Sequence, residues 1–305
     1  MRPPTVAVAG NINGDIVYSL DRLPHLGETL LARGLTVGPG GKASNESVAL
    51  ARLGATPRLV GSVGDDAIGT MVLERLCAAG VDTAHVVRQP GGTTGIATVL
   101  VDNKAENAIV TNLGANMSMQ PGDLPSFDGC DALLLTLGLP GPVLLAACRA
   151  ARVARMLVVV DTTPLSSRVL PPALASADVL SANAVETAQL TGLEPADDAG
   201  ITECCRRLHA LGGARVVLKL GKDGAATYDG DVFGRVSSPQ VDAVDPTGAG
   251  DAFMAGLVVR LLEGDKLEDA ARFACAVGAL ATLGRGAQAG WTTLDDVIRL
   301  LGAEG

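Results

Sequence analysis

Short apolar segments alternate with longer amphipathic segments along most of the chain. Uninterrupted apolar runs are typical of strands in a parallel sheet whose two faces are both covered. Several of the amphipathic segments end at a glycine, which is a common helix stop. This alternation predicts an α/β fold in which a doubly wound, mostly parallel central sheet is flanked by helices. We expect strands at residues 5–9, 58–63, 133–137, 157–161, 179–181 and 215–220, and helices at residues 44–53, 66–79, 143–154, 184–191, 201–211 and 252–262.

Two regions interrupt this alternation, because each contains strand-like segments with no helix between them. These regions cover residues 12–37 and 94–112. We expect them to form a small separate β-sheet that packs over the main sheet as a lid. Its strands are expected at residues 12–20, 29–37, 95–101 and 107–112.

The rest of the chain shows no sign of a boundary between domains. Residues 225–236 predict a β-hairpin with its turn at Asp229-Gly230, and from Ala252 onward the sequence is mostly helical. No internal repeat, charge block or low-complexity linker is present. We therefore expect residues 1–305 to form a single α/β domain, with the lid formed by two insertions.

The composition narrows the classes of function. The chain has 305 residues, of which 48% are hydrophobic and 2% are aromatic, and its formal net charge is −9. A nucleic-acid groove needs a basic face and aromatic platforms for the bases, so this balance disfavours a nucleic-acid partner. An anionic small molecule remains compatible with it, because backbone amides bind phosphate without any net positive charge.

Cysteines, histidines and apolar runs add three expectations. The six cysteines show no CxxC spacing, so we expect reduced, buried thiols in a cytoplasmic protein. The three histidines lie far apart, and no local pattern supports a zinc site or a Ser-His-Asp triad. The longest uncharged run, residues 132–148, is divided by GLPGP, and the N-terminal apolar stretch is too short for a signal peptide. We therefore expect a soluble protein with no membrane partner, in which a carboxylate carries any proton transfer.

The most informative segment is a glycine-rich turn, DPTGAGD, at residues 245–251. It precedes a predicted helix and would expose the unpaired amides of Gly248, Ala249 and Gly250, where the helix dipole adds positive potential. Such a cradle suits a phosphate whose charge shifts during transfer. Asp251 would then lie beside that phosphate and could take the proton of an attacking hydroxyl. Taken alone, an aspartate here is equally well explained as a helix N-cap.

A second glycine-rich turn, GPGGKASNES at residues 38–47, precedes the first predicted helix. Its glycines would let a ligand approach the backbone closely, and Asn45 would project from the first helical turn. It is not a Walker A loop, because the required upstream glycine is missing and Ala43 replaces the Ser/Thr. By itself this segment is compatible with an ordinary turn.

Together, in this order and at this separation, the two segments resemble the signatures of the PfkB/ribokinase family of carbohydrate kinases. Residues 40–64 (GGKASNESVALARLGATPRLVGSVG) look like the N-terminal signature, and DPTGAGD looks like the highly specific C-terminal one. The resemblance covers nearly the whole chain and implies a ribokinase-like fold with a β-sheet lid. It also includes NINGD (residues 11–15), GDDAIG (residues 64–69), NAVE (residues 183–186) and GRGAQ (residues 284–288).

The resemblance implies a role for each matching residue. Asp251 is similar to the family's catalytic base, and Gly248, Ala249 and Gly250 are similar to its anion hole. The positions that resemble sugar-binding residues are Asn13, Asp15, Gly41, Lys42, Asn45 and Asp251. The positions that resemble nucleotide-binding residues are Asn183, Glu186, Lys219, Gly221, Gly224 and Gly248.

The resemblance also implies the cofactors ATP, Mg²⁺ and a K⁺-like ion. Asn183 and Glu186 match the family's NxxE motif, which organises Mg²⁺ and the nucleotide phosphates through water. Many members of the family are activated by a monovalent cation, and a carboxylate with non-helical carbonyls is a suitable ligand set for a hard cation. The implied ligands are Asp245 and backbone oxygens around Thr247, Ala281, Gly284 and Gly286.

The acceptor is the least determined part of the prediction. GGKxxN at residues 40–45 resembles ribokinases more than fructokinases or nucleoside kinases, which implies transfer from MgATP to a primary hydroxyl of a pentose-like sugar, with ribose as the first choice. Ribokinases usually carry a glutamate that contacts the sugar just after the strand expected at residues 133–137, and Gly138 stands there. This difference removes a hydrogen-bond acceptor and leaves room for a larger or differently hydroxylated acceptor.

Alternative functions therefore stay open at this point. A nucleoside kinase of the adenosine or inosine type is compatible with Gly138, although the lid offers only Tyr18 to stack on a base. Another PfkB sugar kinase is a further alternative. A non-catalytic sugar sensor is disfavoured, because Asp251, the GAG turn and the NxxE motif are all intact. Since lid edges ought to be covered and lids of this family often pair across a dimer, the resemblance also implies a homodimer.

Overall fold

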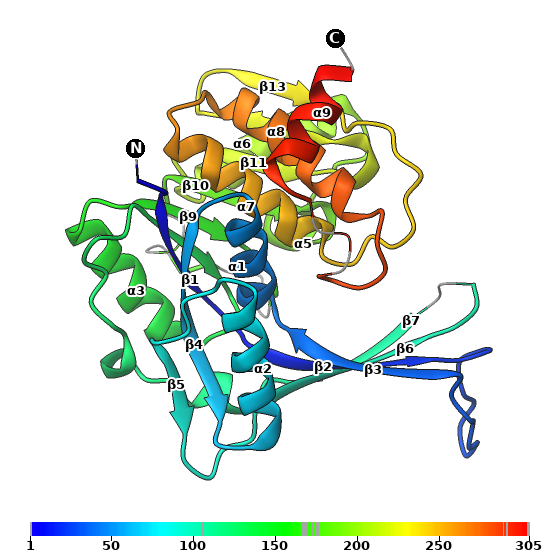
Figure 1. The fold of residues 1–305 in the computed structure, drawn as a ribbon. Coiled ribbons are helices and arrows are strands. Elements are labelled where there is room, and N and C mark those ends of the chain that lie inside the picture. Colours follow the sequence, from blue (N-terminus) through cyan, green and yellow to red (C-terminus); the bar gives the residue numbers. More distant parts are fainter. Residues whose placement is uncertain are drawn as a thin grey trace.

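Two β-sheets and the helices around them make up the structure, a computed structural model that describes residues 2–104, 107–165, 170–171, 174, 177–288, 290 and 292–303 (Figure 1). The strands are β1 (Thr5–Ala9), β2 (Asn13–Ser19), β3 (Gly34–Gly40), β4 (Thr56–Gly64), β5 (Val86–Gln89), β6 (Gly95–Val101), β7 (Asn107–Asn112), β8 (Ala132–Thr136), β9 (Leu157–Asp161), β10 (Val179–Asn183), β11 (Val216–Lys219), β12 (Ala225–Tyr228) and β13 (Phe233–Val236). The helices are α1 (Lys42–Arg52), α2 (Ala67–Ala78), α3 (Gly141–Val153), α5 (Ala184–Thr191), α6 (Asp198–Ala210), α7 (Ala249–Leu262), α8 (Leu267–Ala281) and α9 (Leu294–Ala303).

The central sheet has nine strands in the order β13-β12-β11-β10-β9-β8-β1-β4-β5. Neighbouring strands from β5 to β11 are parallel, whereas the pairs β11–β12 and β12–β13 are antiparallel. The chain moves outward from β1 in one direction to β4 and β5 and in the other direction to β8 and the strands beyond it. The carboxyl ends of β1 and β8 therefore form a topological switch point, which is where open α/β sheets bind their ligands.

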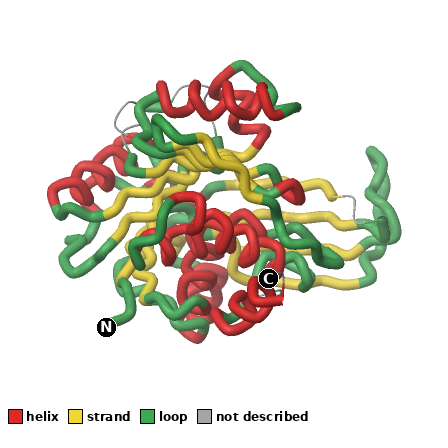
Figure 2. Tube along the Cα trace, turned by 90° about the horizontal axis from the view of Figure 1, so that it is seen from above, coloured by secondary structure: helices red, strands yellow, loops and turns green. Residues whose placement is uncertain are grey.

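Two aliphatic cores cover the two faces of this sheet, because successive side chains of a strand point to opposite faces. Val6 and Val8 of β1 belong to the core that includes α1, α2, α7 and α8, and Ala7 and Ala9 belong to the core that includes α3 and α6. Figure 2 shows the strands between these two layers of helices. The predicted doubly wound α/β architecture is confirmed.

The second sheet is the small lid that the sequence predicts, with strand order β3-β2-β6-β7. It lies against α2, where a Cβ atom on Gly14 would come within 2.5 Å of Ile68 Cγ2, and it extends from there past the body of the molecule (Figure 1). The strand predicted at residues 29–37 begins later than expected, since β3 starts at Gly34. β2 ends at Ser19, whose partner in the register is Gly34, so residues 29–33 have no strand opposite them.

Other differences from the expected elements are small. β10 extends to Asn183, and the edge strand β5 was not expected from the pattern because it is only half-buried. All six cysteines are free, but Cys77 is exposed and Cys130 is partly exposed, so the expectation of buried thiols fails for these two. In the part of the chain that the structure describes, no helix is both long enough and apolar enough to cross a membrane.

Candidate active site

The amino-terminal end of α7 lies at the centre of the site, because the DPTGAGD turn leads directly into it. Gly248 is the N-cap of α7 and has a left-handed backbone with φ of 83°. A Cβ atom at this position would lie 2.5 Å from the carbonyl oxygen of Ala287, so both the conformation and the space require glycine. The Ala249 N–H donates to the carbonyl of Pro246 at 3.1 Å. The sequence predicts an unpaired amide at Ala249, and this prediction is wrong because the amide already has an acceptor.

Two amides of the turn remain available. The N–H groups of Gly248 and Gly250 have no hydrogen-bond acceptor among the described residues. Unpaired amides at a helix N-terminus attract anions, since the helix dipole adds to their partial positive charge. The turn therefore presents two free donors next to the first helical residues of α7.

The Asp251 carboxylate lies in the first turn of α7 and is 1% exposed. Lys42 Nζ lies 2.9 Å from its Oδ1 atom, and Asn45 Nδ2 donates to its Oδ2 atom at 2.7 Å. Both partners come from the first turn of α1, more than 200 residues earlier. The Gln288 side chain in turn donates to Asn45 Oδ1 at 3.0 Å. Three segments that the sequence predicts separately are thus joined in one hydrogen-bonded chain, in which Asn45 bonds both Asp251 and Gln288.

The Lys42 ammonium and the Asp251 carboxylate stabilise each other's charge. Burial alone would lower the pKa of Lys42, but the negative charges of Asp251 and Asp161 and the hydrogen bond to Asp251 outweigh it and raise that pKa. Lys42 therefore keeps its proton and forms an ion pair with Asp251. An Asp251 carboxylate held by an ammonium and an amide has a fixed orientation, as a group that receives a proton in a defined geometry requires.

Asp15 lies at the same end of the site on β2. Its carboxyl group covers Gly40, where a Cβ atom would lie 2.0 Å from Asp15 Oδ1. Burial, and then the negative charge of Asp251, raises the pKa of Asp15 to about 6. Because the negative charge of Asp251 already disfavours ionisation of Asp15, this end of the site does not favour additional negative charge.

The Asn13 side chain has only part of its hydrogen-bonding capacity free. Asn116 Nδ2 donates to Asn13 Oδ1 at 3.1 Å, and the same buried amide also bonds both backbone groups of Ile12. Asn13 Nδ2 is thus the part of this side chain that remains for a ligand. Asn116 was not predicted from the sequence, because no local pattern around it indicates a partner 103 residues away.

The sequence predicts free space beside Gly138 for a larger acceptor. The structure contradicts this prediction, because another side chain occupies that space. A Cβ atom on Gly138 would lie 2.5 Å from Asn11 Oδ1 and 2.6 Å from Asn11 Cβ. Asn11 is 5% exposed and follows β1, whereas Gly138 follows the neighbouring strand β8. The asparagine side chain therefore fills the space beside the glycine.

The NAVE segment forms a reciprocal capping box at the start of α5. Asn183 Oδ1 accepts from the Glu186 N–H at 2.9 Å, and Glu186 Oε2 accepts from the Asn183 N–H at 3.0 Å. Thr162 donates to Glu186 Oε2 at 3.0 Å, and Thr163 donates to Glu186 Oε1. The motif thus has a structural function at the helix start, and its carboxylate is oriented by two hydroxyls at the carboxyl end of β9.

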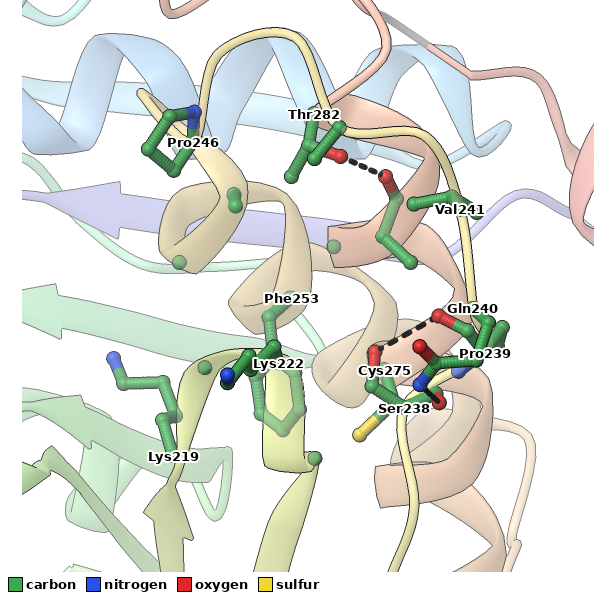
Figure 3. Close-up of a pocket in the computed structure, with 17 residues that line it drawn as sticks. Lys219, Lys222, Ser238, Pro239, Gln240, Val241, Pro246, Phe253, Cys275 and Thr282 are labelled. Atoms are coloured by element: carbon green, nitrogen blue, oxygen red, sulfur yellow. Dashed lines mark hydrogen bonds between the residues drawn. The ribbon is translucent and has the colours of Figure 1, made fainter.

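A cavity of about 250 Å³ lies between α7, α8 and the segments that follow β11 and β13. It contains Lys219, Gly221 and Gly224, which were predicted to lie near the nucleotide, and Gly250 at the start of α7. In Figure 3, Lys219 lies on one side and the chain from Ser238 to Val241 lies on the other. Lys222, inside the segment 219–224 that resembles the family's loop near the nucleotide, also lines the cavity. The lining residues that were not predicted from the sequence are Ser238, Pro239, Gln240, Val241, Ala243, Pro246, Phe253, Cys275, Gly278, Ala279 and Thr282.

Lys219 connects this cavity to a buried carboxylate. Its Nζ atom lies 2.8 Å from Asp161 Oδ1, and Asp161 is fully buried at the end of β9. Since a buried carboxylate needs a paired charge, Asp161 holds the Lys219 ammonium at the edge of the cavity. A cation at this place favours an anionic ligand.

The predicted monovalent-cation residues lie on three segments that Asp245 connects. Asp245 Oδ1 accepts from the Thr247 N–H at 2.9 Å, and Asp245 Oδ2 accepts from the Gly286 N–H at 2.8 Å. The N–H groups of residues 244 and 245 both donate to the carbonyl of Thr282, directly after Ala281 at the end of α8. Burial raises the pKa of Asp245, but hydrogen bonds from Thr247 and Gly286 lower it by more than burial raises it. The pKa therefore lies below its usual value, and the carboxylate stays ionised.

The chain is similar to known kinases over almost its whole length. A family model described as pfkB family carbohydrate kinase matches residues 4–294. A ribokinase of Arabidopsis thaliana is 31% identical over 98% of this chain and 81% of its own, and a ribokinase of Haemophilus influenzae is 31% identical over 97% of this chain and 98% of its own. An ATP-dependent ribose-1-phosphate kinase of Halopiger xanaduensis is 35% identical over 97% of both chains.

Comparison with solved structures agrees with this result. The structure of Arabidopsis thaliana ribokinase complexed with ribose and ATP matches 99% of both chains with a TM-score of 0.89 and 31% identity. A ribokinase structure from Thermotoga maritima matches with a TM-score of 0.87 and 27% identity, over 98% of this chain and 99% of the other. The chain therefore belongs to the pfkB family of carbohydrate kinases, which are phosphotransferases with an alcohol group as acceptor.

Proposed function

We propose that this protein transfers the γ-phosphoryl group of ATP to a primary hydroxyl of ribose. The observation that carries the proposal is the Asp251 carboxylate, held by Lys42 and Asn45 beside the free amides of Gly248 and Gly250. The relatives of similar length that are described as ribokinases support ribose as the acceptor.

In the proposed reaction Asp251 takes the proton of the acceptor hydroxyl. The hydroxyl oxygen then forms a bond to the γ-phosphorus, the bond from that phosphorus to the oxygen of the β-phosphate breaks, and ADP leaves with the electron pair. The Gly248 and Gly250 amides donate to the phosphoryl oxygens, whose charge they stabilise during the transfer. Lys219, Gly221 and Gly224 contact the nucleotide in the neighbouring cavity, and Ala249 contributes through the position of the turn.

The residues fit the two cations implied by the resemblance. No group of three or more His, Cys, Asp or Glu side chains in the described ranges could hold a metal, so Mg²⁺ would be held mainly by water and phosphate, as this ion usually is. Glu186, together with Asn183, would bind its water shell at the end of β9. When bound, Mg²⁺ neutralises charge on the transferring phosphates.

The monovalent cation would be bound by the segments that Asp245 connects. The backbone carbonyls near Thr247, Ala281, Gly284 and Gly286 and the ionised Asp245 carboxylate supply the hard oxygen ligands that K⁺ needs. Because Asp245 also bonds the turn that precedes α7, a cation here would stabilise the anion-binding amides.

The acceptor-binding residues favour a neutral sugar. Asn13, Asp15, Gly41, Lys42 and Asn45 lie at this end, and its one lysine already pairs with Asp251. A sugar phosphate would bring two more negative charges to a corner that holds two carboxylates. Although one relative is described as a ribose-1-phosphate kinase, these charges favour ribose.

An ADP-release assay with a panel of acceptors tests the proposed function. We expect the highest kcat/KM with ribose, lower values with fructose and ribose 1-phosphate, and the lowest with adenosine and inosine. Omitting K⁺ should lower the rate. A nucleoside as the best acceptor would replace the proposal by a nucleoside kinase, and sugar binding without any ADP would replace it by a sugar sensor.

We further propose a cytoplasmic homodimer that pairs through the lid. Large apolar side chains of the lid region are exposed, and unpaired sheet edges invite pairing with a second chain. These side chains are Leu26, Leu31, Leu35, Ile109 and Val110. Light scattering at assay concentration should give twice the mass of one chain, and a monomeric mass would contradict this part of the proposal.

A further inference from the structure

Asn11 and Gly138 lie together at the switch point of the central sheet. Asn11 follows β1 and Gly138 follows β8, and these two strands are parallel neighbours in register. A Cβ atom on Gly138 would lie within 2.7 Å of three atoms of the Asn11 side chain. Such distances are far below an ordinary contact, so any side chain at position 138 would displace Asn11.

The Asn11 carboxamide is buried without a partner for its oxygen. Asn11 is 5% exposed, and its Oδ1 atom has no hydrogen-bond donor among the described residues. Buried polar atoms nearly always have a partner, because an unpaired one loses its hydrogen bonds to water without gaining any in the protein. An unpaired carboxamide oxygen at a ligand-binding edge therefore points to a donor that a ligand supplies.

The surroundings of Asn11 favour a hydroxylated ligand. The backbone carbonyl of Asn11 lies 2.5 Å from the position of a Cβ atom on Gly41, the N-cap of α1, so Asn11 is next to the residues proposed to bind the acceptor. Thr136, the last residue of β8, has a fully buried hydroxyl that also lacks a partner. Asn11 is as buried as Asn45, which is 6% exposed and bonds Asp251.

We propose that Asn11 is a specificity-determining residue that accepts a hydrogen bond from a hydroxyl of the sugar acceptor. This inference rests on the proposed function and adds a residue to it. Gly138 makes this position of Asn11 possible, because only glycine leaves space for the asparagine side chain. Since the carboxamide is neutral, it recognises a hydroxyl without adding a third negative charge to an acceptor end that already contains Asp15 and Asp251.

The test compares Asn11→Ala with wild type on ribose and on deoxyribose analogues that each lack one hydroxyl. With ribose, we expect kcat/KM to fall about 10- to 100-fold, while KM for ATP stays unchanged. For one analogue the substitution should have almost no further effect, because the hydroxyl that Asn11 contacts is already missing. Asn103→Ala, at an exposed turn, is the matched control and should behave as wild type.

Gly138→Ala offers a second, independent variant. Its Cβ atom should displace the Asn11 side chain and cause a similar loss with ribose, and the double variant should lose little more than Asn11→Ala alone. Ribose should raise the Tm of the wild type, and this shift should be smaller in either variant. If Asn11→Ala does not fold, Gly138→Ala gives the same comparison.

The outcomes separate the inference from the proposed function. No ADP release from ribose by the wild type overturns the proposed function. An active wild type with Asn11→Ala within twofold of it overturns the inference alone. An equal loss on ribose and on every deoxy analogue also overturns it, because Asn11 would then act only on the structure of the site.

Discussion

The proposed acceptor end and the cavity proposed for the nucleotide lie on neighbouring parts of the molecule but are built from different kinds of residues. At the acceptor end, polar side chains bond one another: Lys42 and Asn45 hold Asp251, and Asn116 holds Asn13. The cavity is lined mostly by glycine, alanine, proline and other apolar residues from four separate segments (Figure 3). The first region is thus organised by side-chain hydrogen bonds, and the second by the shape of the backbone.

This difference indicates how each region discriminates between ligands. A site with buried polar groups rejects an analogue that leaves them unpaired, whereas an apolar pocket separates ligands weakly and mainly by size. We therefore expect the protein to be more selective for its acceptor than for the base of its nucleotide. Single substitutions at the acceptor end should accordingly have larger effects than substitutions that line the cavity.

The largest effect is expected for Asp251→Asn. This change keeps the size of the side chain but removes the group that takes the proton, so kcat should fall about 10²- to 10⁴-fold, while ATP and ribose still bind. The measurement is ADP release together with calorimetric binding of both substrates. Asp128→Asn, an exposed aspartate, is the matched control and should keep full turnover. Near-normal turnover of Asp251→Asn would refute its assignment as the base.

A smaller effect is expected for Ala243→Phe, which places a large ring in the cavity. KM for ATP should rise about tenfold, since the ring occupies part of the ligand volume, and KM for ribose should not change. The neighbouring Val244 is 50% exposed and does not line the cavity. Val244→Phe is therefore the control, and steady-state kinetics of both variants make the comparison. A rise in KM for ribose alone would show that the cavity is not the nucleotide site.

The smallest expected effect concerns the pH dependence of stability rather than activity, and it is measured with Asp15→Asn. Because the pKa of Asp15 is raised to about 6 from 3.8, the folded protein holds this proton more tightly than the unfolded chain. Stability from this group therefore decreases as pH rises from 3.8 to 6 and then stays level. Asp15→Asn removes this decrease. The free energy of unfolding of the variant minus that of wild type should therefore be about 1 kcal/mol larger at pH 8 than at pH 4.5.

Urea unfolding at the two pH values measures this difference. Asp128→Asn again serves as the exposed control, and its difference from wild type should not depend on pH. A constant difference between Asp15→Asn and wild type would mean that Asp15 is ionised as easily in the folded protein as in the unfolded chain.

Local patterns were sufficient for most elements of the fold and for several parts of the site. The apolar runs predict β1, β8 and β9, and NAVE and DPTGAGD place a cap or a glycine turn at the start of α5 and α7. These features depend on neighbours three or four positions away, or on the backbone freedom of one glycine such as Gly248, so a single segment contains the necessary information. The edge strand β5 and the true start of β3 were missed, because they depend on which strand lies opposite.

Contacts between distant segments were decided only by the tertiary structure. Nothing near Lys42 indicates that its ammonium pairs with a carboxylate 209 residues later, and nothing near Asn11 indicates that its side chain fills the space beside Gly138. Such contacts follow from the strand order, which brings the carboxyl ends of β1 and β8 side by side, and from the packing of α1 against α7. Residue types and turns are properties of a segment, but the partner of a buried polar group depends on all the segments that surround it.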